Sequence, residues 1–151
     1  MTGAPSFAVG WQEPVYVPAP AAGAVWTHKV DGRYYERLLA VTYTFTTSAV
    51  VANRNIVLNM LDSNGVIITQ VPGSFALPAS TVASDFFQVN SPSYDFAPGA
   101  NTYRYLPDFL VPPGWSWNSS VSSIDVGDAF TGVVLLVQRF PNDAAMISAE
   151  Y

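Results

Sequence analysis

The sequence predicts an all-β protein: a jelly-roll-like β-sandwich with an extended N-terminal arm rich in proline and alanine. Short runs of alternating apolar and polar residues follow one another, and they are separated by turn sequences such as DSNG, NSPS, APGAN, VPPG and DVGD. No window of useful length shows the apolar period of about 3.6 residues that a helix would bury. Evenly spaced strands without helices indicate a sandwich, above all a jelly roll of about eight strands, while an immunoglobulin-like or barrel topology stays open.

We divide the chain of 151 residues into an arm (1–26), a body (27–140) and a C-terminal tail (141–151). The arm contains GWQEPVYVPAPAAGAVW (10–26), in which large apolar side chains alternate with prolines that are excluded from the interiors of helices and strands. A proline-rich backbone is already extended and loses little entropy on docking. We expect this segment to lie in grooves of a neighbouring chain; the alternatives are an arm that wraps around its own body and a flexible tail.

The first strand of the body is expected at 37–46, where Leu39, Val41, Tyr43 and Phe45 alternate with alanine and threonine. A hairpin follows. Its first strand (53–61) places Ile56, Leu58 and Met60 on one face, DSNG (62–65) supplies the turn, and 66–71 returns. Further strands are expected at 84–89, 102–106, 115–124 and 128–140.

The composition is apolar and poor in charge. Half of the residues are hydrophobic, 11% are charged and the formal net charge is −5. Soluble domains usually have about 25% charged residues, so we expect a chain that works inside an assembly. Clustered lysines and arginines for a nucleic-acid backbone are missing, and the longest uncharged run (63–84) is too polar to span a membrane. We therefore expect neither nucleic acid nor membrane as a partner.

The sequence offers no convincing catalytic set, and we expect no enzyme and no cofactor. His28 is the only histidine and cysteine is absent, so a nucleophilic triad would depend on His28 alone. Four aspartates (Asp95, Asp108, Asp125 and Asp128) could act as glycosidase carboxylates, but each lies in a turn, where Asp commonly bonds to the backbone. Asp125 and Asp128 in IDVGD also resemble a fragment of a calcium loop, although two carboxylates make a poor site.

Exposed aromatic residues are the better candidates for function. Trp115 and Trp117 share strand parity and would lie beside Tyr103 and Tyr105 if their strands pair, as a glycan platform or, as we favour, one wall of the core. The loop 94–105 is rich in tyrosine, with one arginine, as contact surfaces often are. The candidate interface residues are Trp11, Val15, Tyr16, Val17, Trp26, Tyr94, Tyr103, Arg104 and Tyr105.

Two stretches, 26–61 and 105–140, carry a resemblance to a known group. Trp26 and His28 form a Trp-x-His opening before a threonine-rich strand, and a "vanR" stretch follows at Val51–Arg54. A late "LP…L-x-P-G" turn, at Leu106–Gly114, precedes the final strand. In these features the chain resembles small virion structural proteins of tailed bacteriophages.

The resemblance implies a β module on a phage particle, as a head decoration (cement) protein or a minor head, neck or tail component. It implies the major capsid protein or other virion subunits as partners, and we expect a homo-oligomer, with a trimer as one candidate. Two alternatives stay open. One is a tail or neck module of lectin type that binds a host glycan through Trp115, Trp117 and the loop 94–105; the other is a glycan-degrading enzyme that uses the turn aspartates.

Overall fold

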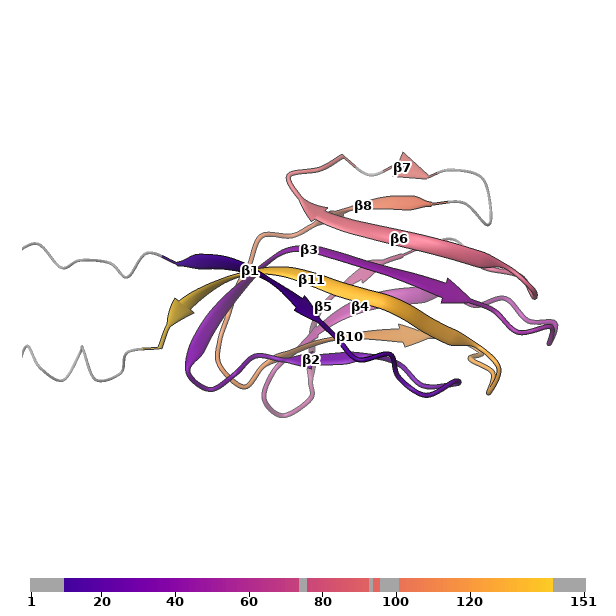
Figure 1. Cartoon of the computed structure of the whole chain (residues 1–151), viewed down its shortest axis with the longest axis horizontal. Helices are drawn as coiled ribbons and strands as arrows, with labels where there is room; N and C mark the ends of the chain where they lie inside the picture. Colours follow the sequence, from indigo (N-terminus) through magenta and orange to yellow (C-terminus); the bar gives the residue numbers. More distant parts are fainter. Residues whose placement is uncertain (1–9, 74–75, 93, 96–100, 143–151) are drawn as a thin grey trace, which may run out of the picture.

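The protein is a sandwich of two β-sheets (Figure 1). The computed structural model describes residues 10–73, 76–92, 94–95 and 101–142. Every regular element among these residues is a strand, so the predicted all-β, jelly-roll-like sandwich is confirmed. The described part of the chain contains no helix long and apolar enough to cross a membrane.

The larger sheet has the strand order β1-β11-β3-β6-β8-β7, and β9 pairs with β3 beside this path. Its strands are β1 (Trp11–Tyr16), β3 (Tyr34–Thr46), β6 (Val82–Val89), β7 (Tyr94–Asp95), β8 (Thr102–Leu106), β9 (Leu110–Val111) and β11 (Ala129–Pro141). Neighbouring strands are antiparallel except β6 and β8, which run parallel.

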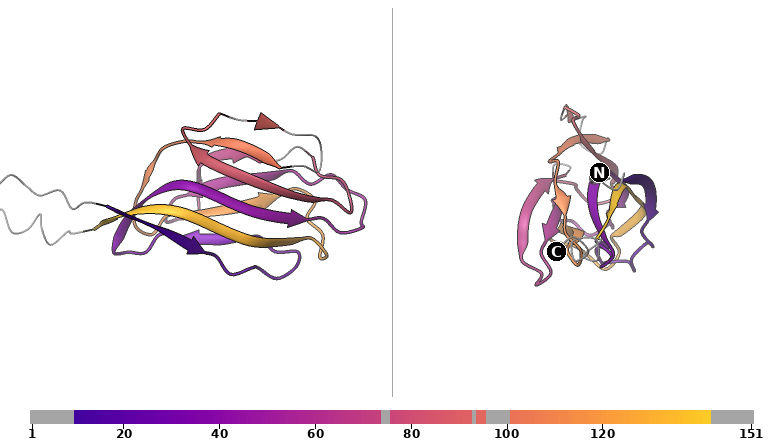
Figure 2. Two further views of the ribbon diagram at one scale, coloured as in Figure 1. Left: turned by 45° about the horizontal axis from the view of Figure 1, so that its top comes forward. Right: turned by 90° about the vertical axis from the view of Figure 1, so that its left-hand side faces the viewer.

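The smaller sheet has the order β2-β10-β4-β5, and all its pairs are antiparallel. Its strands are β2 (Thr27–Lys29), β4 (Ile56–Leu61), β5 (Ile67–Pro72) and β10 (Ser116–Val121). The predicted hairpin is confirmed, because β4 and β5 pair through a turn in which Gly65 has a φ of 80°. Figure 2 shows the two layers from the side and from one end.

The predicted alternation of β3 is correct for Val41, Tyr43 and Phe45, which are buried, but wrong for Leu39. Leu38 is buried in its place. The pairing of β3 with β11 shifts register here, so that Leu136 faces Ala40 while Val137 faces Leu38. One extra residue in a strand is a β-bulge, and it moves the following side chains to the opposite faces.

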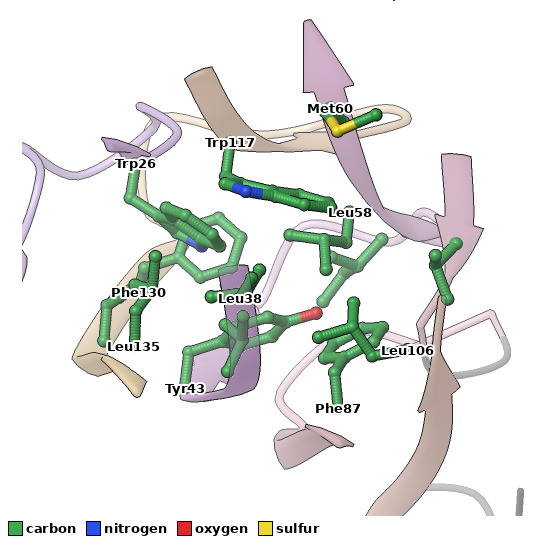
Figure 3. Packing of buried hydrophobic residues seen from close by; sticks show 14 of the residues in the cluster. Trp26, Leu38, Tyr43, Leu58, Met60, Phe87, Leu106, Trp117, Phe130 and Leu135 are labelled. Carbon is green, nitrogen blue, oxygen red and sulfur yellow. The ribbon is translucent and has the colours of Figure 1, made fainter. Parts of the chain in front are cut away.

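The core lies between the two sheets. The smaller sheet contributes Leu58, Met60 and Trp117, which meet Tyr43, Phe87 and Phe130 from the larger sheet (Figure 3). Trp117 is 1% exposed and therefore belongs to the core, as favoured from the sequence, and does not form a glycan platform. The strand of Trp117 does not pair with the strand of Tyr103 and Tyr105, because β10 lies between β2 and β4 in the other sheet.

Residues 11–16 are not an arm outside the body. They form β1, the edge strand of the larger sheet, and they pair with β11 of the same chain from Trp11↔Arg139 to Tyr16↔Val134. Proline is tolerated in an edge strand because the side that lacks an N–H can face solvent, which explains why Pro14 does not prevent strand formation. Residues 1–9 of the expected arm and 143–151 of the expected tail lie outside the described residues.

Candidate interaction surface

Four segments that are distant in the sequence meet at one end of the sandwich. Figure 1 shows β3 ending and β6 and β11 beginning at this end. Backbone hydrogen bonds join the segments: the Thr47 amide donates to the Thr81 carbonyl over 2.8 Å, and the Gly23 amide donates to the Asp128 carbonyl over 2.8 Å. The end is therefore built from residues 21–25, 47–54, 77–82 and 122–128.

A buried ion pair fixes two of these segments. Arg54 and Asp128 are both 0% exposed, and the Arg54 Nε donates to an Asp128 oxygen over 3.0 Å. The other guanidinium nitrogens of Arg54 donate to the Val50 and Ala52 carbonyls, over 2.7 and 2.8 Å, and to the Ser48 hydroxyl. Arg54 thus holds the loop 47–54 in one conformation from inside, which a bidentate donor such as guanidinium does well.

The carboxylate of Asp128 also accepts several hydrogen bonds. Besides Arg54, it accepts hydrogen bonds from the Ser48 and Asp125 backbone amides, over 2.7 and 2.8 Å. Burial by itself would raise the pKa of Asp128, but these donors outweigh it and hold the pKa below its ordinary value. Asp125 accepts from the Gly127 amide, which lowers its pKa too.

These contacts confirm the structural interpretation of the turn aspartates for Asp125 and Asp128. The carboxylate oxygens of Asp128 accept hydrogen bonds from Ser48, Arg54 and Asp125. They are therefore not free to coordinate a calcium ion, which needs several oxygen ligands. Among the described residues, no group of three or more His, Cys, Asp or Glu side chains is placed to hold a metal ion. Asp108 pairs with Arg37, and the side chain of Asp95 lies outside the described part.

Aliphatic side chains cover the outside of this end. The exposed fraction is 92% for Val51 and 83% for Val126, the two most exposed of the set. Five exposed valines make up the surface that we call the valine end: Val25, Val50, Val51, Val82 and Val126. In the four segments the only charged residues are Arg54 and Asp128, which are buried and paired, and Asp125, which is partly exposed. The valine end is therefore almost free of charge.

Charged side chains gather at the opposite end of the sandwich. Glu36, 1% exposed, accepts from His28 over 2.7 Å and from Arg139 over 2.8 Å, and Arg139 also pairs with Glu13 of β1. The hydrogen-bonding capacity of the His28 side chain is thus used by Glu36, whose carboxylate links β2 of the smaller sheet to β3 of the larger sheet. The exposed pairs of this end are Arg33–Asp31 and Arg37–Asp108.

The expected interface residues of the N-terminal segment do not form one surface. Tyr16 is 74% exposed and Trp11 is 39% exposed, with an edge-to-face contact to Tyr34. Val15 and Val17 pack against the core of their own chain. Trp26 is 1% exposed, which corrects its assignment as a contact residue: the sandwich itself buries the ring.

In the second expected cluster, Tyr103 stacks on Phe86, with ring centroids 5.0 Å apart, and is 37% exposed. Tyr105 is 47% exposed. The Arg104 guanidinium donates to the Gly73 carbonyl over 2.9 Å, so this arginine ties β8 to the chain segment after β5. The Tyr94 side chain lies outside the described residues. The side chains of Tyr103 and Tyr105 are partly exposed, and Arg104 makes a hydrogen bond within its own chain.

Sequence reasoning missed the valine end. One signal was present: the uncharged stretch from Ser48 to Asn53 lies between two strands, where polar turn residues are usual. The other valines come from two separate loops and from the start of β6, and their neighbourhood is visible only in three dimensions.

No family model matches the chain, and no curated protein matches it. Among solved structures, the chain is similar to the dimeric latent PorU from Porphyromonas gingivalis, with a TM-score of 0.42 and 11% sequence identity. The match covers 93% of this chain and 14% of that chain, so this chain corresponds to a small part of the other protein. A likeness this distant carries no information about function.

Proposed function

We propose that this chain is a structural protein of a bacteriophage virion, a capsid decoration (cement) or minor capsid protein that stabilises the particle. The observation that carries the proposal is the valine end, a rigid surface with exposed aliphatic side chains and almost no charge. Exposed apolar side chains gathered at one end of a protein commonly mark a site of contact with another protein. The resemblance of 26–61 and 105–140 to small virion proteins, together with the low fraction of charged residues, points to the same class.

The partner surface follows from the chemistry of the valine end. A charged partner group buried against Val51 or Val126 would lose its hydration without a counter-charge, which costs several kcal/mol. The surface on the virion subunit must therefore be apolar and uncharged at the contact. We therefore propose the contact at the valine end, whereas the sequence predicted contacts from the N-terminal arm.

The test is binding to capsid particles that lack this chain, measured by co-sedimentation. The variant V51D/V126D places two carboxylates in the contact and should weaken binding at least about tenfold, which corresponds to about 1.4 kcal/mol. The control V66D/I68D adds the same charge to β5 and the turn before it, where Val66 is 58% and Ile68 is 48% exposed. This control should bind like the unchanged chain, and circular dichroism should show both variants folded.

Equal particle binding by V51D/V126D and the unchanged chain would refute the valine end as the contact. Absence of particle binding by the unchanged chain, together with binding to a host glycan, would refute the structural role and favour the lectin-like module. Deletion of residues 1–26 would not be a clean test of an arm, because it would remove β1 and the buried Trp26.

A further inference from the structure

We propose that β1 is an exchangeable strand: in a pair of chains, β1 of one copy takes the place of β1 on β11 of the other. The partner is a second copy of this chain, and the docking surface is the edge of β11. The proposal concerns the chain alone and does not depend on a role in a virion.

The first argument is the shallow attachment of β1. It is an edge strand with one neighbour, and none of its six residues is fully buried. Val15 and the following Val17 are the residues of this region that pack against the core. Apart from Val15, from Trp11, which contacts Tyr34, and from Glu13, which pairs with Arg139, the side chains of β1 lie at the surface.

The second argument is that every partner of β1 is also present on another copy. The strand β11 with its Arg139, and Tyr34 of the next strand β3, supply these contacts, and neither belongs to the connection that follows β1. A second copy of β1 would regain the same backbone pairing, ion pair and ring contact. Exchange of an identical element is therefore a low-cost route to a dimer, in which only the connection changes.

The third argument is the connection itself. Residues 18–25 contain two prolines and form no strand, and they reverse the chain direction between β1 and β2 through a turn at Ala21–Ala24. Gly23 has a φ of 77°, and a Cβ atom there would lie 2.9 Å from the Val126 Cα. If the turn opens, eight residues of extended, proline-rich chain reach about 25 Å, which is enough to carry β1 away from its own sheet.

The experiment uses engineered thiols, because the chain has no cysteine of its own. Gln12 and Gln138 are opposite each other in the pairing of β1 with β11. Opposite Cα atoms in antiparallel strands lie about 4.5 to 5.5 Å apart, within the range of a disulfide. The double variant Q12C/Q138C should form an intrachain disulfide, which establishes that the geometry permits the bond.

The two single variants, carrying tags of different size, are then mixed at increasing concentration and oxidised. Exchange predicts a disulfide between Q12C of one chain and Q138C of the other, seen as a heterodimer on a non-reducing gel. A mixture of Q12C with Q88C gives the background, because Gln88 is an exposed residue of β6, which is not a neighbour of β1.

Gly23→Ala strains the turn of the closed form and should raise the heterodimer yield severalfold. Gly65→Ala is the matched control, because Gly65 also has a positive φ, of 80°, but lies in the β4–β5 turn. The proposal would be overturned if the yield of heterodimer stayed at the Q88C background at every concentration, both with the unchanged turn and with Gly23→Ala. An equal increase for Gly23→Ala and Gly65→Ala would overturn it as well, since general destabilisation would then explain the dimer.

Discussion

The Arg54–Asp128 pair provides the sharpest test of how this sandwich holds its loops. We consider the variant Arg54→Met, which keeps an unbranched side chain of similar length and removes the charge and all the donors. Arg54 makes hydrogen bonds to Asp128, to the Val50 and Ala52 carbonyls and to the Ser48 hydroxyl. After the substitution the Asp128 carboxylate remains 0% exposed and loses its counter-charge.

Breaking a buried ion pair from one side costs about 3–5 kcal/mol. The total free energy of unfolding of a domain is about 5–15 kcal/mol, so the variant should lose a large part of it. With a denaturant slope of about 2 kcal/mol per M, the urea midpoint should fall by about 2 M. The control is Arg33→Met, which breaks the exposed pair with Asp31, where Arg33 is 75% exposed, and should leave the urea midpoint nearly unchanged.

Urea unfolding followed by tryptophan fluorescence measures both variants. The double variant Arg54→Met/Asp128→Leu should recover part of the loss, because a buried pair replaced on both sides by apolar groups leaves no uncompensated charge. A midpoint for Arg54→Met within the range of the Arg33→Met control would refute the role of this pair as the anchor of the valine end.

Two further predictions follow from the same structure. The pKa values of Asp125 and Asp128 are lowered in the folded chain. The two carboxylates therefore contribute their full stabilisation above the unfolded pKa of about 3.9, and this stabilisation is lost as the pH falls through the lowered folded values. Urea midpoints should therefore change little between about pH 7 and 5 and fall below about pH 4, and equal midpoints at pH 7 and pH 3 would contradict this. Trp117→Ala should lower the free energy of unfolding by about 3–5 kcal/mol, because Trp117 is 1% exposed. Tyr16→Ala, at a residue that is 74% exposed, should lower it by less than about 1 kcal/mol. Thermal unfolding compares the two variants, and similar losses of stability would argue against Trp117 as a core residue.

The local pattern of apolar, polar and turn residues was sufficient to predict several strands of the sandwich. Alternation predicted the buried Val41, Tyr43 and Phe45, and the Asn-Gly turn predicted the hairpin of β4 and β5. These features depend on residues a few positions apart, whose geometry the backbone fixes by itself. The same reasoning failed at Leu39, because a bulge depends on the partner strand, which lies almost a hundred positions further along the chain.

The sequence by itself determined the fold class, the longer strands of the body and the low charge of this protein. Only the tertiary structure decided that β1 pairs with β11, that Arg54 meets Asp128, and that valines from separate segments share one end. The physical reason is that strand pairing and ion pairing are set by which surfaces can be buried together, and residues 74 positions apart carry no local sign of that contact. The two proposed surfaces, the valine end and the edge of β11, arise from this long-range packing.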